Sequence, residues 1–205
     1  MAFMKISFYW FVICWFGRSI AAAENGQKKP DYPPALFVFG DSLADAGNNN
    51  FIPNCAARAD FPPYGMSFFG HPTGRFTNGR TVIYFIATNL GLPFPSPYFD
   101  PQANFSTGIN FASGGSGLLD STGQDLNIIS LSHQIWQFTH FASTLVKKNG
   151  GIAVESYLSK SLYCISIGGN DIRNGERGVW HCDCSFERIK WTQCKRKISN
   201  TRGVE

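Results

Sequence analysis

Three mostly apolar runs of this chain each lead into a short segment of glycine with serine, asparagine or aspartate. The runs and the segments that follow them are Ala35–Phe39 before Gly40-Asp41-Ser42, Gly108–Ala112 before Ser113-Gly114-Gly115, and Leu162–Ile167 before Gly168-Gly169-Asn170. Short, nearly continuous apolar runs are typical of strands that are buried on both faces of a sheet. Each run therefore predicts a buried strand whose carboxyl end carries polar side chains.

Longer segments between these runs carry apolar residues at helical spacing. The apolar residues are Val82, Ile83, Phe85, Ile86 and Leu90 in the first segment, and Leu131, Ile135, Phe138, Phe141, Ala142 and Leu145 in the second, which spans Ser130–Lys148. A short helix is predicted over Ile152–Ser159. Strands that alternate with helices predict an α/β fold with a parallel sheet covered on both faces. Ligands of such sheets bind at the carboxyl ends of the strands, so we expect the three polar segments to converge.

Ser42 is the candidate nucleophile, because it follows the first predicted strand and would project beyond the sheet. Gly40 allows the backbone to turn tightly before it. The same Asp41-Ser42 pair could instead cap the start of a helix, since both residue types cap well. The residues alone leave these two interpretations open.

Gly115 and Asn170 are candidate donors to an oxyanion. Acyl transfer requires hydrogen-bond donors where negative charge develops, and each one can lower the barrier by roughly 3–4 kcal/mol. A backbone N–H in a glycine-rich loop and an asparagine amide suit this role. An ordinary tight turn at Gly114-Gly115 and an Asx-turn at Asn170 are the structural alternatives.

Four sequence blocks occur in an order that resembles a known family. They read GDSLADAGNN, GRFTNGR, INFASGGSG and SIGGND, within residues 35–172. Together they resemble the plant secreted GDSL esterase/lipases of the SGNH hydrolase superfamily. The resemblance implies an α/β/α sandwich with a flavodoxin-like parallel sheet, incomplete at its C-terminal end.

The resemblance also implies a function for the three candidate residues. Ser42 matches the nucleophile of the family, and Gly115 and Asn170 match its oxyanion glycine and asparagine. The implied reaction is hydrolysis of a small acyl or lipid ester through an acyl-enzyme, without a metal or other cofactor. Acyl transfer to an alcohol is an alternative outcome at the same site.

The sequence departs from the family where the catalytic histidine is expected. No D-x-x-H segment occurs in it, and its histidines are His71, His133, His140 and His181. None of them matches the family position, and a serine without a base is a weak nucleophile. We therefore expect an impaired hydrolase, or alternatively a non-catalytic acyl-binding or regulatory remnant of one.

The N-terminal residues 1–23 are predicted to be a secretory signal peptide. The apolar run Ile6–Phe16 is shorter than the roughly 20 residues that span a bilayer, and Ala21 and Ala23 form an A-x-A cleavage site. We therefore expect a secreted protein without stable membrane insertion. Asn104 lies in an Asn-Phe-Ser sequon and is a candidate glycosylation site.

Residues 24–172 are predicted to form the hydrolase domain, and residues 173–205 a divergent basic tail. Residues 173–205 hold eight Lys or Arg and four Asp or Glu, scattered in a way that does not predict nucleic-acid binding. The tail cysteines Cys182, Cys184 and Cys194 do not have the spacing of a structural zinc site. With no further strand predicted beside Leu162–Ile167, we expect an open sheet edge that could support self-association.

Overall fold

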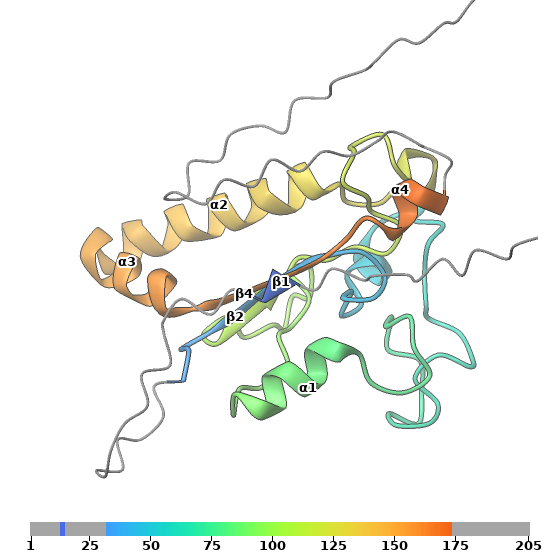
Figure 1. The fold of residues 1–205 in the computed structure, drawn as a ribbon, viewed down its shortest axis with the longest axis horizontal. Coiled ribbons are helices and arrows are strands. Elements are labelled where there is room, and N and C mark those ends of the chain that lie inside the picture. The colour runs from blue at the N-terminus through green and yellow to red at the C-terminus, as the bar shows by residue number, and fades with distance from the viewer. Residues whose placement is uncertain (1–12, 15–31, 174–205) are drawn as a thin grey trace, which may run out of the picture.

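The structure, a computed structural model, describes residues 13–14 and 32–173 (Figure 1). Most of the predicted signal peptide and all but the first residue of the predicted tail lie outside these residues. The predictions for the cleavage site, for His181 and for the tail cysteines therefore stay predictions.

The sheet has four strands in the order β1-β4-β2-β3. They are β1 (Ile13–Cys14), β2 (Leu36–Gly40), β3 (Gly108–Asn110) and β4 (Leu162–Ser166). Strand β2 is parallel to both of its neighbours, and Phe37 stands opposite Ile109 of β3 and Tyr163 of β4. The predicted parallel sheet, with the first apolar run at its centre, is confirmed.

Helices cover both faces of this sheet, as Figure 1 shows. They are α1 (Val82–Asn89), α2 (Leu131–Asn149), α3 (Gly151–Lys160) and α4 (Gly169–Arg173), with 3-10 turns at η1 (Asn48–Phe51) and η2 (Gln124–Leu126). Helices α2 and α3 lie on one side of the strands and α1 lies on the other. The predicted α/β/α sandwich is confirmed for the described part of the chain.

Alternate side chains of β2 build the two halves of the core. Leu36 and Val38 pack with Ile83 and Ala87 of α1. On the opposite face, Phe37 is fully buried, and its ring centroid lies between 5.3 and 6.3 Å from those of four aromatic residues. Those residues are Phe138, Phe141, Tyr157 and Tyr163. The side chains of β2 therefore pack against helices on both faces of the sheet.

The predicted apolar faces of two helices differ in part from the buried ones. In α1, Val82 is 59% exposed and Phe85 is 47% exposed, although both belong to the predicted face. In α2 the fully buried side chains include Gln134 and Gln137, which the apolar pattern did not single out. The buried face of α2 is rotated toward these two glutamines because Phe141 and Phe138 pack against Phe37.

The expectation that β4 has no neighbour on its far side was wrong at two positions. Ile13 and Cys14 of β1 pair antiparallel with Ile165 and Cys164. An unpaired strand edge offers N–H and C=O groups to any extended apolar segment, and the run predicted as a signal peptide supplies one. The pairing covers only part of the five-residue strand β4.

Cys55 and Cys164 are both buried in the core. Within residues 13–14 and 32–173, no helix has the length and apolar character needed to cross a bilayer.

We expect Phe37→Ala to lower the free energy of unfolding by about 3–5 kcal/mol, because it empties the centre of the aromatic cluster. Phe51→Ala is the matched control, since Phe51 is 45% exposed and should cost less than about 1 kcal/mol. Urea denaturation followed by tryptophan fluorescence measures both values. Equal losses for the two variants would contradict the placement of Phe37.

Candidate active site

Asp41 directs the chain away from the sheet directly after β2. Its backbone N–H donates to the Ser166 carbonyl at 3.0 Å, and its carboxylate accepts the Leu43 N–H at 3.0 Å. Burial raises the pKa of Asp41, and the nearby Asp171 charge adds to the increase while the Leu43 N–H opposes it. No helix starts directly after Asp41-Ser42, so the helix-cap alternative is not what this segment does, and Asp41 instead closes a turn.

The Ser42 side chain is half-buried, and among the described residues its hydroxyl has no hydrogen-bond partner. It lines a pocket of about 390 Å³. Apolar side chains of Leu43, Phe76, Val82, Ile83 and Ile167 contribute to the walls, with Arg80 beside them. The hydroxyl is thus available at the wall of a mainly apolar pocket.

Buried asparagines join the segment after β2 to the segment after β3. The Asn48 amide donates to the carbonyls of Asn110 and Ala112, both at 2.8 Å, and the Asn110 amide donates to Ala44 at 2.7 Å. The Asn49 amide donates to Gly114 at 2.9 Å. These side chains replace strand pairing where the backbones leave the sheet, which explains a run of amide-bearing residues in the core.

Asp45 makes a second connection between the same two segments. Its carboxylate is fully buried and accepts the N–H groups of Gly47 and Asn48 at 2.8 Å and of Gly114 at 2.9 Å. Burial raises the pKa of Asp45 to about 6, although these three N–H groups favour the charged form. Near neutral pH the carboxylate therefore holds Gly114, next to Gly115, against the segment that bears Ser42.

Asn170 points toward the loop that carries Gly115. Its amide donates to the Ser116 carbonyl at 2.8 Å, which leaves its second amide hydrogen for another acceptor. Gly115 has a φ of +94°, a conformation that favours glycine. The structure thus brings Asn170 and the Gly115 loop together, but neither Gly115 nor Asn170 lines the pocket beside Ser42.

The buried side chain of Asp171, which is 1% exposed, holds the loop after β3 in place. Its carboxylate accepts the N–H groups of Leu118 and Leu119 at 2.8 and 3.1 Å and the Thr122 hydroxyl at 2.8 Å. The start of α4 is therefore fixed to the loop after β3 by two consecutive side chains, Asn170 and Asp171.

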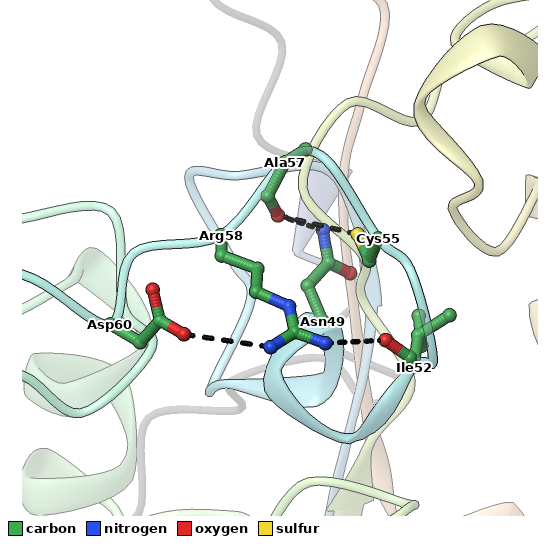
Figure 2. A network of polar contacts seen from close by, with 6 residues as sticks. All are labelled: Asn49, Ile52, Cys55, Ala57, Arg58 and Asp60. Atoms are coloured by element: carbon green, nitrogen blue, oxygen red, sulfur yellow. Dashed lines mark hydrogen bonds and ion pairs between the residues drawn. The ribbon is translucent and has the colours of Figure 1, made fainter.

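The loop after η1 has a polar network of its own, drawn in Figure 2. The Asn49 amide donates to Ala57 at 2.6 Å, and the Arg58 guanidinium donates to the Ile52 carbonyl at 2.7 Å. Arg58 also lies 3.7 Å from Asp60. Asn49 therefore joins this loop to Gly114 as well as closing the loop itself.

The two arginines of the GRFTNGR block stack on aromatic rings. Arg75 lies 5.0 Å from the ring centroid of Phe69 and 4.5 Å from that of Phe94, and Arg80 lies 4.6 Å from those of Phe68 and Phe85. Cation–π contacts of this kind fix the long loop against α1. They also hold Arg80 in place at the pocket.

The three histidines that the structure describes contact residues other than Ser42 or are exposed. His133 and His140 pack on either side of Trp136 on the exposed face of α2, and His71 is exposed in the long loop. No histidine side chain of residues 32–173 hydrogen-bonds to Ser42. In the same range, no group of three or more acidic, His or Cys residues could hold a metal ion.

The sequence interpretation missed Asp45, Asn48, Asn110 and Gln134 as residues that shape the site. Gln134 and Gln137 share one helix face with Phe138 and Phe141, so polar residues at core spacing were the available indication. Asp45 and Asn48 had no periodic pattern around them, and only the folded structure brings them to Gly114 and Asn110.

The comparisons with known proteins identify the family of this chain. The family model described as GDSL-like Lipase/Acylhydrolase matches residues 36–190, so the chain belongs to this family. The match extends beyond residue 172, where we predicted the domain to end. That boundary stays a prediction, because nothing in the described structure tests it.

Two relatives from Arabidopsis thaliana illustrate the similarity. GDSL esterase/lipase 6 is 49% identical over 72% of this chain and 41% of its own length. GDSL esterase/lipase 7 is 43% identical over 80% of this chain and 46% of its own length. The chain thus spans less than half the length of these relatives. No solved structure matches it.

We expect Asp45→Asn to change how stability depends on pH. The folded protein binds the Asp45 proton more tightly than the unfolded chain does, since burial raises this pKa from 3.8 to about 6. The contribution of Asp45 to stability is therefore greatest below about pH 4 and is lost as the pH rises through 6. Asparagine does not titrate.

Urea unfolding of both proteins from pH 4 to 7.5 measures this effect. The stability of the wild type relative to Asp45→Asn should fall with rising pH, by about 3 kcal/mol at most. Titrations common to both proteins, including that of Asp41, cancel in the difference. A wild-type advantage that grows with pH would mean that the N–H donors outweigh burial.

Proposed function

We propose that this chain carries the acyl-accepting part of a serine ester hydrolase. The observation that carries the proposal is the Ser42 hydroxyl, which has no described partner and lines a mainly apolar pocket at the carboxyl edge of the sheet. Membership in the GDSL-like lipase/acylhydrolase family supports the same chemistry.

In the proposed reaction, the Ser42 oxygen attacks the carbonyl carbon of a carboxylic ester. The carbonyl oxygen gains the negative charge, and the N–H groups of Ser42 and Gly115 with the Asn170 amide donate to it. Collapse of this intermediate expels the alcohol and leaves an acyl-serine, which water then hydrolyses. The apolar walls of the pocket support a small acyl or lipid ester as substrate.

The step that needs explanation is removal of the Ser42 proton. The described histidines do not contact Ser42, and the sequence contains no D-x-x-H segment. We therefore propose that turnover by this chain is low for lack of a base. The second candidate function, a non-catalytic acyl-binding or regulatory protein, is favoured by the same observation.

Chemical rescue separates these functions. We expect the wild-type chain to hydrolyse p-nitrophenyl butyrate slowly and imidazole to increase the Ser42-dependent rate at least about tenfold, since a general base contributes that much or more. Imidazole also cleaves the ester in solution, so Ser42→Ala with the same imidazole concentration is the control. Released p-nitrophenolate is measured by its absorbance.

The outcomes have distinct meanings. Identical rates for wild type and Ser42→Ala with imidazole would reject the hydrolase proposal and leave acyl binding as the remaining function. Fast Ser42-dependent turnover without imidazole would show that a base is present after all.

We also propose that the protein is secreted and glycosylated at Asn104. The A-x-A segment before Glu24 and the exposure of Asn104 support this. Expression in a plant or insect secretion system should give an N-terminus at or near Glu24 and a mass that falls after removal of N-glycans. Asn104→Gln should abolish that mass change, and an intact Met1 in the secreted protein would contradict the cleavage.

Such a cleavage would remove Ile13–Cys14 and leave the outer edge of β4 without a strand partner among residues 32–173. We propose that this edge then supports self-association, as unpaired strand edges commonly do. A monomer by light scattering after cleavage would reject this proposal.

A further inference from the structure

The fully buried Gln134 of α2 contacts both parts of the candidate site. Its side-chain oxygen accepts the Gly40 N–H at 2.9 Å, and its amide donates to the Gly40 carbonyl at 2.9 Å. The same amide lies 3.2 Å from the Ser116 hydroxyl and 3.2 Å from the Ile129 carbonyl. One side chain from the helical layer thus binds the end of the nucleophile strand and the loop that carries Gly115.

Gly40 needs this partner because of its position in the sheet. Strand β3 ends at Asn110, and beyond it the Ser113 N–H still donates to the Gly40 carbonyl at 3.0 Å, while the Gly40 N–H donates to the side chain of Gln134. The primary amide of Gln134 thus pairs with both backbone groups of Gly40 and shares the Gly40 carbonyl with the Ser113 N–H. On the other side Gly40 packs so closely on β4 that an added Cβ would clash with the Ser166 carbonyl oxygen.

The contacts continue from Gln134 to the second candidate oxyanion residue. Ser116 receives the Gln134 amide on its hydroxyl, and its carbonyl accepts the Asn170 amide at 2.8 Å. Gly40 lies two residues before Ser42, and Ser116 directly follows Gly115. These hydrogen bonds therefore connect Asn170 with the segments that carry Gly115 and Ser42.

We infer that Gln134 is a positioning residue of the candidate site, which sets the Gly115 loop and Asn170 at a fixed distance from Ser42. The inference rests on the proposed function for its effect on reactivity. Its structural part, the connection between Gly40 and Ser116, stands independently of any activity.

Gln134→Met tests this inference against Gln137→Met. Both glutamines are buried in α2, one turn apart, but the Gln137 side-chain oxygen has no hydrogen-bond partner among the described residues. We expect Gln134→Met to speed backbone amide hydrogen exchange at least about tenfold in residues 36–44 and 113–118, but not in α1. Loss of these hydrogen bonds should open only the two segments that they join. Gln137→Met should leave all three regions unchanged.

Reactivity is measured with an alkyl fluorophosphonate, which labels an activated serine, in the presence of imidazole. Gln134→Met should lower the maximal labelling rate of Ser42 at least about tenfold, with a smaller effect on the half-saturating concentration. A residue that only stabilises the fold would lower the folded fraction and leave the rate of the folded protein unchanged.

Gln134→Glu supplies a test that does not require loss of the whole side chain. Its carboxylate keeps the acceptor for Gly40 N–H but presents an oxygen to the Gly40 carbonyl, and a protonated carboxyl restores one donor. We expect its labelling rate, as a ratio to wild type, to recover as the pH falls from 8 to 5. The ratio cancels the titrations of Asp41 and Asp45, which both proteins share.

Two results overturn the inference. The first is unchanged exchange in residues 36–44 and 113–118 for Gln134→Met, and the second is a Gln134→Glu ratio that does not vary with pH. Absence of labelling in the wild type would instead reject the proposed hydrolase function, while the exchange experiment would still decide whether Gln134 connects the two segments.

Discussion

Parallel pairing of β2 with both β3 and β4 is the constraint on which the rest of the structure depends. Carboxyl ends of parallel strands meet at one edge of the sheet, so three segments far apart in the sequence are brought together there. The alternating side chains of β2 bury apolar surface against helices on both faces, which fixes the register of this central strand. The position of Ser42, two residues beyond the carboxyl end of β2, is therefore fixed by the register of this strand.

Beyond that edge, polar side chains take over from the strand ladder. Buried backbone groups must be paired, and each unpaired one costs roughly 1–3 kcal/mol. Asn48, Asn110 and Gln134 pair with backbone groups where the strands have ended, and Asp45 accepts three backbone N–H groups. Side-chain hydrogen bonds thus replace strand pairing beyond the ends of the strands. They also connect the segment of Ser42 to the loop of Gly115.

The family relation and the local geometry address different parts of the function. The family relation supports ester hydrolysis, while the chain spans less than half the length of the relatives compared with it. The described residues place a serine, a glycine loop and an asparagine around one sheet edge, and they place the histidines elsewhere. The described residues thus supply the donors that we propose for an oxyanion, but no histidine among them contacts Ser42.

The sequence by itself predicted strands β2, β3 and β4, helices α1, α2 and α3 and the three candidate residues, because apolar period and glycine-rich strand ends are local properties of a chain. It could not determine which face of α2 is buried, since Gln134 and Gln137 gain their place from distant partners such as Gly40 and not from hydrophobicity. Only the tertiary structure decided that Asp41 caps the turn and that Asp45 binds Gly114, because those hydrogen bonds depend on three-dimensional proximity. The pairing of Ile13–Cys14 with β4 also came from the tertiary structure, because the periodicity of a sequence does not show which segment pairs with a strand edge.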